Sequence, residues 1–300
     1  MKRILIFAIS LLIAGSTLAA DKLNVVTTTE DGASITREIG GDRLTVTGIG
    51  KGYQDPHFIE PKPSFLLLLR KADLLEVIGL ELEIGWLPPL LDQSRNNNIR
   101  PGQKGYLDLS AGVEILDRPS NVNRSMGDVH PLGNPHYWLD PANAVRMGIE
   151  VANKLTELRP ADGPYFAQRL QSFKVRMNEA NKRWLAQMAP YRGAKIVTYH
   201  NSLPNFVRHF GLVVVDHVEP KPGIPPSPSH TLELINEIKD QKVKVIIMEP
   251  YFDRKTPDSI AERTGSKVVV MYPSVGGKTE LDDYFKLFDY NIDQLVKALK

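Results

Sequence analysis

The chain contains no cysteine among its 300 residues. This absence excludes disulfide bonds, thiolate metal ligands and a lipid-modified cysteine behind an N-terminal signal. The folded protein must therefore be stabilised by its core alone. Any strong metal site in it must be built from histidine and carboxylate side chains.

The sequence also lacks an excess of charge of either sign. It has 37 basic and 35 acidic residues, and removing Lys2 and Arg3 with an N-terminal signal leaves 35 of each. A balanced chain of this kind shows none of the basic patterning that nucleic acids or anionic membrane surfaces require. We therefore expect no nucleic-acid partner.

Long hydrophobic runs are missing except at the N-terminus. Lys2-Arg3 precedes an apolar run from Ile4 to Ala14, and small residues then lead to Ala19 and Ala20. This arrangement is typical of a secretory signal peptide that is cleaved. An uncleaved anchor is the alternative, but the run is shorter than the ~20 apolar residues of a membrane span. We predict a signal peptide over residues 1–20 and a periplasmic mature protein.

Beyond this segment, strand-like and helix-like stretches alternate. In the first half we expect strands at 22–29, 43–48 and 73–79, and a helix at 82–91 that Pro88-Pro89 interrupts. Such alternation is typical of α/β folds with mainly parallel sheets flanked by helices. The second half repeats the plan. We predict two lobes, residues 21–159 and 191–300, with a pseudo-duplicated architecture.

The stretch from Pro160 to Pro190 carries the clearest helical pattern in the chain. Its apolar residues recur every three or four positions: Phe166, Leu170, Phe173, Met177, Ala180, Trp184 and Met188. At ~1.5 Å per residue such a helix would extend about 40 Å, whereas a typical globular helix has ~11 residues. We predict that residues 160–190 form one long helix that links the two lobes.

Three histidines stand where a strand ends or in the loop that follows a strand region: His57, His136 and His200. In open α/β sheets, ligands bind in the crevice outside the carboxyl ends of the strands. Neutral imidazole is also a preferred ligand of zinc. These three side chains are therefore candidate ligands of one metal ion, although a single loop histidine is more often solvated or hydrogen-bonded.

The other histidines carry a weaker signal. We interpret His209, His217 and His230 as ordinary hydrogen-bonded or solvated side chains. The role of His130 stays open, because a loop histidine six residues before His136 could be a ligand, a supporting group or a surface residue.

Several motifs, in a fixed order, resemble one family. They are Asp-Pro-His57-Phe-Ile-Glu-Pro, Asn-Pro-His136-Tyr-Trp-Leu-Asp-Pro, Tyr-His200-Asn-Ser, Pro222-Gly-Ile-Pro-Pro-Ser-Pro and Ile-Met-Glu249-Pro. Together they are similar to the zinc- and manganese-binding substrate-binding proteins of ABC importers, the ZnuA/TroA group. The resemblance covers essentially the whole mature chain. It implies two α/β lobes joined by a rigid long helix, a metal ion in the cleft between them, and delivery of that ion to a membrane permease.

Because their motifs match those of the family, the resemblance implies that His57, His136 and His200 are metal ligands. One feature of this chain differs from the family pattern. Such proteins often supply an aspartate near the start of the loop after the last strand, where this chain has Tyr272-Pro273. Glu249, at the end of its own strand, is the remaining carboxylate candidate for the fourth ligand. It could instead hydrogen-bond backbone or support the ligands, with water as the fourth ligand.

Three imidazoles with one carboxylate or water suit Zn²⁺ better than Mn²⁺, which prefers more oxygen ligands. We therefore expect zinc as the transported ion, with manganese as the alternative, and a monomeric, non-enzymatic protein. Three other classes remain open. One is a metal-dependent hydrolase in which Glu249 acts as general base on a zinc-bound water. The others are a binding protein for a chelated metal and an adhesin-like protein.

Overall fold

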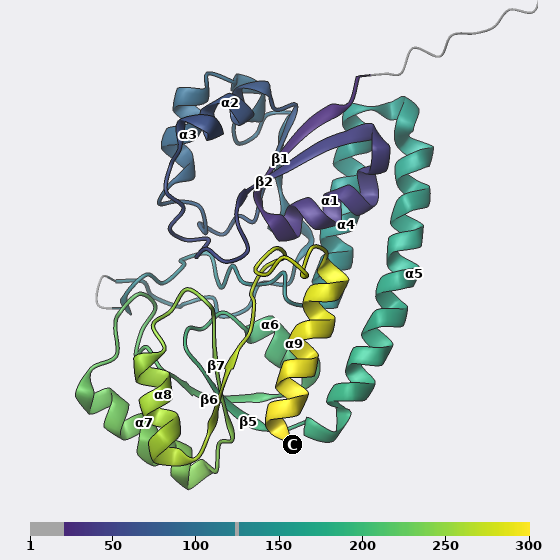
Figure 1. Ribbon diagram of the computed structural model, residues 1–300. Coiled ribbons are helices and arrows are strands. Elements are labelled where there is room, and N and C mark those ends of the chain that lie inside the picture. Colours follow the sequence, from purple (N-terminus) through teal and green to yellow (C-terminus); the bar gives the residue numbers. More distant parts are fainter. Residues whose placement is uncertain (1–20, 124–125) are drawn as a thin grey trace, which may run out of the picture.

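The computed structural model describes residues 21–123 and 126–300. The predicted signal peptide over residues 1–20 lies outside the described residues. Two α/β lobes lie one above the other, and a long helix runs beside both of them (Figure 1). No helix within the described ranges combines the length and the apolar composition needed to cross a membrane.

The first lobe is built on a sheet of four parallel strands in the order β2-β1-β3-β4. The central strand β1 is buried at every position but Asn24, as expected for a strand covered on both faces. The strands are β1 (Leu23–Thr29), β2 (Leu44–Gly50), β3 (Leu74–Val77) and β4 (Tyr106–Asp108). The helices of this half are α1 (Glu30–Gly40), α2 (Pro63–Lys71), α3 (Leu87–Ser94) and α4 (Pro141–Leu158).

The second lobe repeats this sheet. Its four parallel strands have the order β6-β5-β7-β8, which corresponds strand for strand to the first lobe. The strands are β5 (Lys195–Thr198), β6 (Val213–His217), β7 (Val245–Met248) and β8 (Lys267–Val270). The helices are α6 (Pro204–Phe210), α7 (Pro228–Gln241), α8 (Lys255–Thr264) and α9 (Tyr284–Leu299). The shared order agrees with the pseudo-duplicated plan expected from the sequence.

The long helix α5 (Gly163–Met188) confirms the predicted helical pattern. Of the seven apolar positions only Leu170 is not fully buried. The helix contacts α1 and α4 of the first lobe and α9 of the second, and Figure 1 shows it alongside both. Near its C-terminal end Trp184 stacks on Phe288 of α9 with ring centroids 4.7 Å apart. One amphipathic helix therefore buries its apolar stripe against both lobes.

Two local expectations were wrong. Residues 80–86 form turns, and α3 begins only at Leu87, so Pro88 and Pro89 lie in its first turn rather than interrupting a longer helix. Proline is tolerated there because the first backbone N–H groups of a helix have no partner within it. The fourth strand, β4, was not predicted, because three residues are too few for a strand pattern to be recognised.

One hydrophobic cluster extends through both lobes, in addition to a separate cluster in each. A single cluster of buried residues includes Val25 of β1, Trp138, and Ile247 of β7. Polar contacts cross between the lobes as well. The Trp138 Nε1–H donates to the Pro273 carbonyl over 2.7 Å, and the Val275 amide donates to Asp31 Oδ1 over 3.1 Å. The loop in which the family resemblance suggested an aspartate ligand thus joins the lobes instead.

A buried carboxyl group stands on β3 in the first lobe. Glu76 is fully buried, its Oε2 accepts a hydrogen bond from Thr36 Oγ1 over 2.6 Å, and its Oε1 has no partner among the described residues. Burial raises the pKa of Glu76 to about 8, against the lowering effect of the Thr36 bond. At neutral pH this side chain is therefore a neutral acid.

We expect Glu76→Gln to flatten the pH dependence of stability. Between about pH 7 and 8 the native protein keeps a Glu76 proton that the unfolded chain, with glutamate pKa near 4.3, has lost. Native binding of an extra proton makes stability fall as pH rises, by up to about 1.4 kcal/mol per pH unit. Glutamine removes this contribution. The check is urea unfolding of the metal-free protein at pH 7.0, 7.5 and 8.0.

The matched control is Glu262→Gln, the same change at an exposed position of α8. It should keep the slope of the parent protein. An unchanged slope in Glu76→Gln would show that Glu76 is ionised in the native protein.

Candidate metal centre

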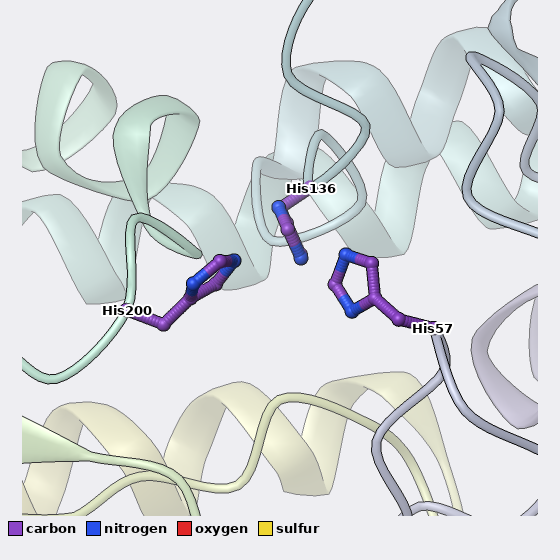
Figure 2. A group of neighbouring side chains, drawn as sticks. All are labelled: His57, His136 and His200. Atoms are coloured by element: carbon purple, nitrogen blue, oxygen red, sulfur yellow. The ribbon is translucent and has the colours of Figure 1, made fainter. Parts of the chain in front are cut away.

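Three loops deliver one histidine each to a common point between the lobes. His57 follows β2, His136 precedes α4 in the first lobe, and His200 follows β5 in the second. Each offers one ring nitrogen, and these three atoms all lie within 4.8 Å of one another. Figure 2 shows the rings directed toward one another. The structure thus brings together the three histidines that the sequence singled out.

His136 is held by the residue two positions before it. The Asn134 Oδ1 accepts hydrogen bonds from the His136 backbone N–H and Nδ1, each over 2.9 Å. Because Nδ1 then carries the proton, Nε2 presents a free lone pair. That nitrogen is buried and has no partner among the described residues. Burial, followed by the charges of His57 and His200, lowers the pKa of His136 well below the usual value, so the ring is neutral.

His57 repeats this local arrangement. The Asp55 Oδ1 accepts from the His57 backbone N–H over 3.0 Å and from Nδ1 over 2.7 Å. Burial acts to raise the pKa of Asp55, but the hydrogen bond and charge of His57 outweigh it and lower the pKa. Asp55 is therefore an ionised carboxylate. In both Asp-Pro-His57 and Asn-Pro-His136, the residue two positions before the histidine orients the ring through a hydrogen bond to its Nδ1.

His200 is oriented by a distant residue instead. Its Nδ1 pairs with Glu219 Oε1, and both side chains are buried. Burial acts to lower the pKa of His200, but the Glu219 bond and charge outweigh it and raise the pKa. Hydrogen bonds that the second ring nitrogen donates to carboxylate or amide oxygens are the usual support of metal-binding imidazoles.

The supporting carboxylates also set the charge of the site. Asp55 and Glu219 are acidic groups held against two of the three rings. Their negative charges complement a divalent cation in a region that is largely removed from water. Sequence reasoning did not assign either residue. The motif around His57 carried a signal for Asp55, whereas Glu219 lies 19 residues from His200 and had none.

Glu249, the predicted fourth ligand, is not in the group of side chains whose ligand atoms converge. It is buried directly after β7, its Oε1 accepts a hydrogen bond from Ser202 Oγ, and its Oε2 has no partner among the described residues. Burial raises the pKa of Glu249 to about 7, against the Ser202 bond and the His200 charge. Its role as a direct ligand stays a prediction.

Of the remaining histidines, one approaches a candidate ligand directly, and the other three bond residues outside the group of converging rings. His130 Nε2 lies 3.1 Å from His57 Nε2. His209 bonds Asp140 and Asn181, His217 bonds Thr198, and His230 bonds the His217 carbonyl. These three have the ordinary hydrogen-bonded roles expected of them. His130 borders the site itself.

Two cavities open beside the three nitrogens. One has a volume of about 390 Å³ and apolar walls that include Phe58 and Phe252. The other has about 210 Å³ and includes Asp117 and His217 in its lining. His130 and His200 line both, so the site lies between the two cavities.

The fold consists of two lobes with parallel sheets and one linking helix, and three histidines converge between the lobes. These features define the class of two-lobed metal-binding proteins that serve transport. The chain belongs to the family described as zinc-uptake complex component A, periplasmic (ZnuA), whose model matches residues 25–298.

Its relatives are named as metal transport proteins. It is 25% identical over 288 residues to the metal ABC transporter substrate-binding lipoprotein ScbA of Streptococcus cristatus, covering 93% of this chain and 90% of that one. It is 24% identical over 292 residues to the manganese ABC transporter substrate-binding lipoprotein PsaA of Streptococcus pneumoniae, covering 94% and 91%. A zinc-bound deletion mutant of ZnuA superposes with a TM-score of 0.78 at 25% identity, covering 93% and 98%.

We expect Glu219→Gln to weaken zinc binding about 10- to 100-fold, the usual range for loss of a group that supports a metal ligand. Glutamine keeps the size of the side chain but removes the charge held against His200. Competition with a zinc chelator of known affinity measures the change. Glu233→Gln on the exposed face of α7 is the matched control and should bind zinc as the parent does. Equal affinities for both variants would contradict the assigned role.

Two substitutions of Asp55 separate the effect of its charge on metal binding from its effect on the orientation of the His57 ring. Asp55→Asn reproduces the Asn-Pro-His sequence that already holds His136, so it should keep the ring orientation and lose only the charge. Asp55→Ala loses both. We expect the alanine variant to bind zinc more weakly than the asparagine variant, with the parent tightest, in the same competition assay. The reverse order of the two variants would show that Asp55 does not orient His57.

Proposed function

We propose that this protein captures zinc outside the cytoplasm and delivers it to the permease of an ABC importer. His57, His136 and His200 are the ligands in this proposal. The observation that carries it is the convergence of three imidazoles, each anchored through Nδ1, on a point between the lobes. The buried and unpartnered Nε2 of His136 gives that point its chemistry, because an orphan buried acceptor costs free energy unless something binds it.

Zinc is the proposed ion because of the donor set. Imidazole nitrogen suits Zn²⁺, whereas Mn²⁺ prefers carboxylate, carbonyl and water oxygen. The carboxylates Asp55 and Glu219 are engaged with ring nitrogens, so they contribute charge rather than oxygen ligands in this proposal. Relatives are named for manganese and for zinc, so the donor set of this chain is what favours zinc.

A binding role is favoured over hydrolysis. A hydrolase would need Glu249 positioned on a metal-bound water. Here Glu249 is engaged by Ser202 and lies outside the group of converging nitrogens. The relatives are substrate-binding components of transporters, which supports capture and release without chemistry.

The proposed location follows from the N-terminal sequence. A cleaved signal peptide would release a monomer into the periplasm, where it would carry the ion to a permease in the inner membrane. The named relatives are lipoproteins, but this chain contains no cysteine to carry a lipid.

We expect the purified protein to bind about one Zn²⁺, and His200→Ala to bind it more than about 100-fold more weakly, since loss of a ligand exceeds the loss of a supporting group. The readout is chelator competition, with circular dichroism to confirm folding. His230→Ala is the control, because that ring bonds the His217 carbonyl instead of entering the site. Parent-like zinc affinity in folded His200→Ala would overturn the ligand assignment.

A further inference from the structure

We propose that His130 is the fourth ligand of the ion, so that the site closes as an all-imidazole set. This inference rests on the proposed zinc-binding function. It assigns the coordination position for which neither the Tyr272 loop nor Glu249 shows a converging donor atom.

The fourth position needs a donor that is not already engaged. Three nitrogens leave one corner of a zinc tetrahedron open. Near the site, Asp55 and Glu219 bond ring nitrogens. Glu249 accepts from Ser202 through Oε1, and although its Oε2 is unpartnered among the described residues, Glu249 is not in the group whose ligand atoms lie within 4.8 Å of one another. Tyr272 is turned to α9, where its amide bonds Asn291 Oδ1 over 3.0 Å. None of these side chains replaces the aspartate expected of the family.

His130 lies at the spacing that a shared ion requires. Its Nε2 is 3.1 Å from His57 Nε2, and two nitrogens bound to one tetrahedral zinc at ~2.0–2.1 Å lie about 3.3–3.4 Å apart. The ring centroids of His130 and His57 are 5.2 Å apart. Those of the three converging rings are separated by 5.0, 5.6 and 5.2 Å. The Nε2 atoms of these two imidazoles therefore face each other at nearly the separation of two ligands of one ion.

The ring of His130 is also supported like the other three. It hydrogen-bonds the backbone of Leu80, in the turn that follows β3. Leu80 and Glu81 adopt left-handed backbone conformations there, with φ of 54° and 66°. Such conformations are uncommon for these residue types and occur where the surroundings demand them. A hydrogen bond from a metal-binding histidine to a backbone carbonyl is a usual support of the ring.

His130 must move before its Nε2 can join the other three ring nitrogens around one ion. The centroids of His130 and His136 are 6.4 Å apart, and His130 is not among the nitrogens that lie within 4.8 Å of one another. His130 therefore reaches the group through His57 and must move toward His136 to bind the same ion. Its loop is tied to the second lobe by the Asp128 amide, which donates to the Pro222 carbonyl over 2.9 Å. The movement required is local to a short loop.

Two consequences follow for the ion. Four nitrogen ligands without oxygen favour Zn²⁺ over Mn²⁺ more strongly than three do. Because His130 lines both cavities beside the site, its ligation would also place a ring between the ion and these cavities. The same residue would thus favour zinc and help to enclose the ion.

X-ray absorption at the zinc edge of the zinc-loaded full chain tests the assignment by counting imidazoles. We expect four in the parent and in His230→Ala, and three plus an oxygen ligand in His130→Ala. Zinc affinity in His130→Ala should fall about 10- to 100-fold. The ratio of zinc to manganese affinity should fall with it, whereas the His230→Ala control should keep both.

The outcomes separate this inference from the function on which it rests. A parent with three imidazoles and one oxygen, together with parent-like affinity in His130→Ala, would overturn the role of His130 and leave zinc binding intact. A parent that binds no zinc would overturn the proposed function itself. Unfolding temperatures of both variants without metal establish that a loss of affinity is not a loss of folding.

Discussion

The structure depends on bringing three imidazole nitrogens to one point, where the buried Nε2 of His136 has no partner among the described residues. Burying such acceptors costs free energy, and neighbouring rings add to the cost if any of them is protonated. Hydrogen bonds from the Nδ1 atoms to Asn134, Asp55 and Glu219 fix the tautomers and direct the opposite ring nitrogens inward. The site is thus assembled before an ion arrives, and ion binding satisfies what folding left unsatisfied.

Convergence of this kind requires lobes with a defined relative position. The core that includes residues of both sheets supplies it, and α5 buries one apolar stripe along both halves. Contacts through Trp138, Asp31 and the loop after β8 add directed polar bonds between the lobes. Because packed cores resist deformation, small movements of the histidine loops would cost less free energy during binding and release than a large rotation of the lobes.

Members of one family bind different metals on one fold, so selectivity must reside in few residues. In this chain the loop after β8 carries Tyr272-Pro273 and binds the other lobe through Pro273 and Val275. The acidic groups Asp55 and Glu219 bond ring nitrogens of the candidate ligands. In the proposed zinc site these carboxylates supply charge, and the imidazoles supply the ligand atoms.

Much of the fold and three of the converging residues could be predicted from sequence. The period of apolar residues identified α5, the alternation of strands and helices identified the parallel sheets, and local Pro-His motifs identified His57 and His136. These signals are local, because a hydrophobic stripe or a turn is encoded by neighbouring residues. Tertiary structure alone decided the pairing of Glu219 with His200, the engagement of Glu249 by Ser202, and the approach of His130 to His57 across 73 residues. Such contacts arise from the way distant strands and loops are packed, and no short stretch of sequence carries that information.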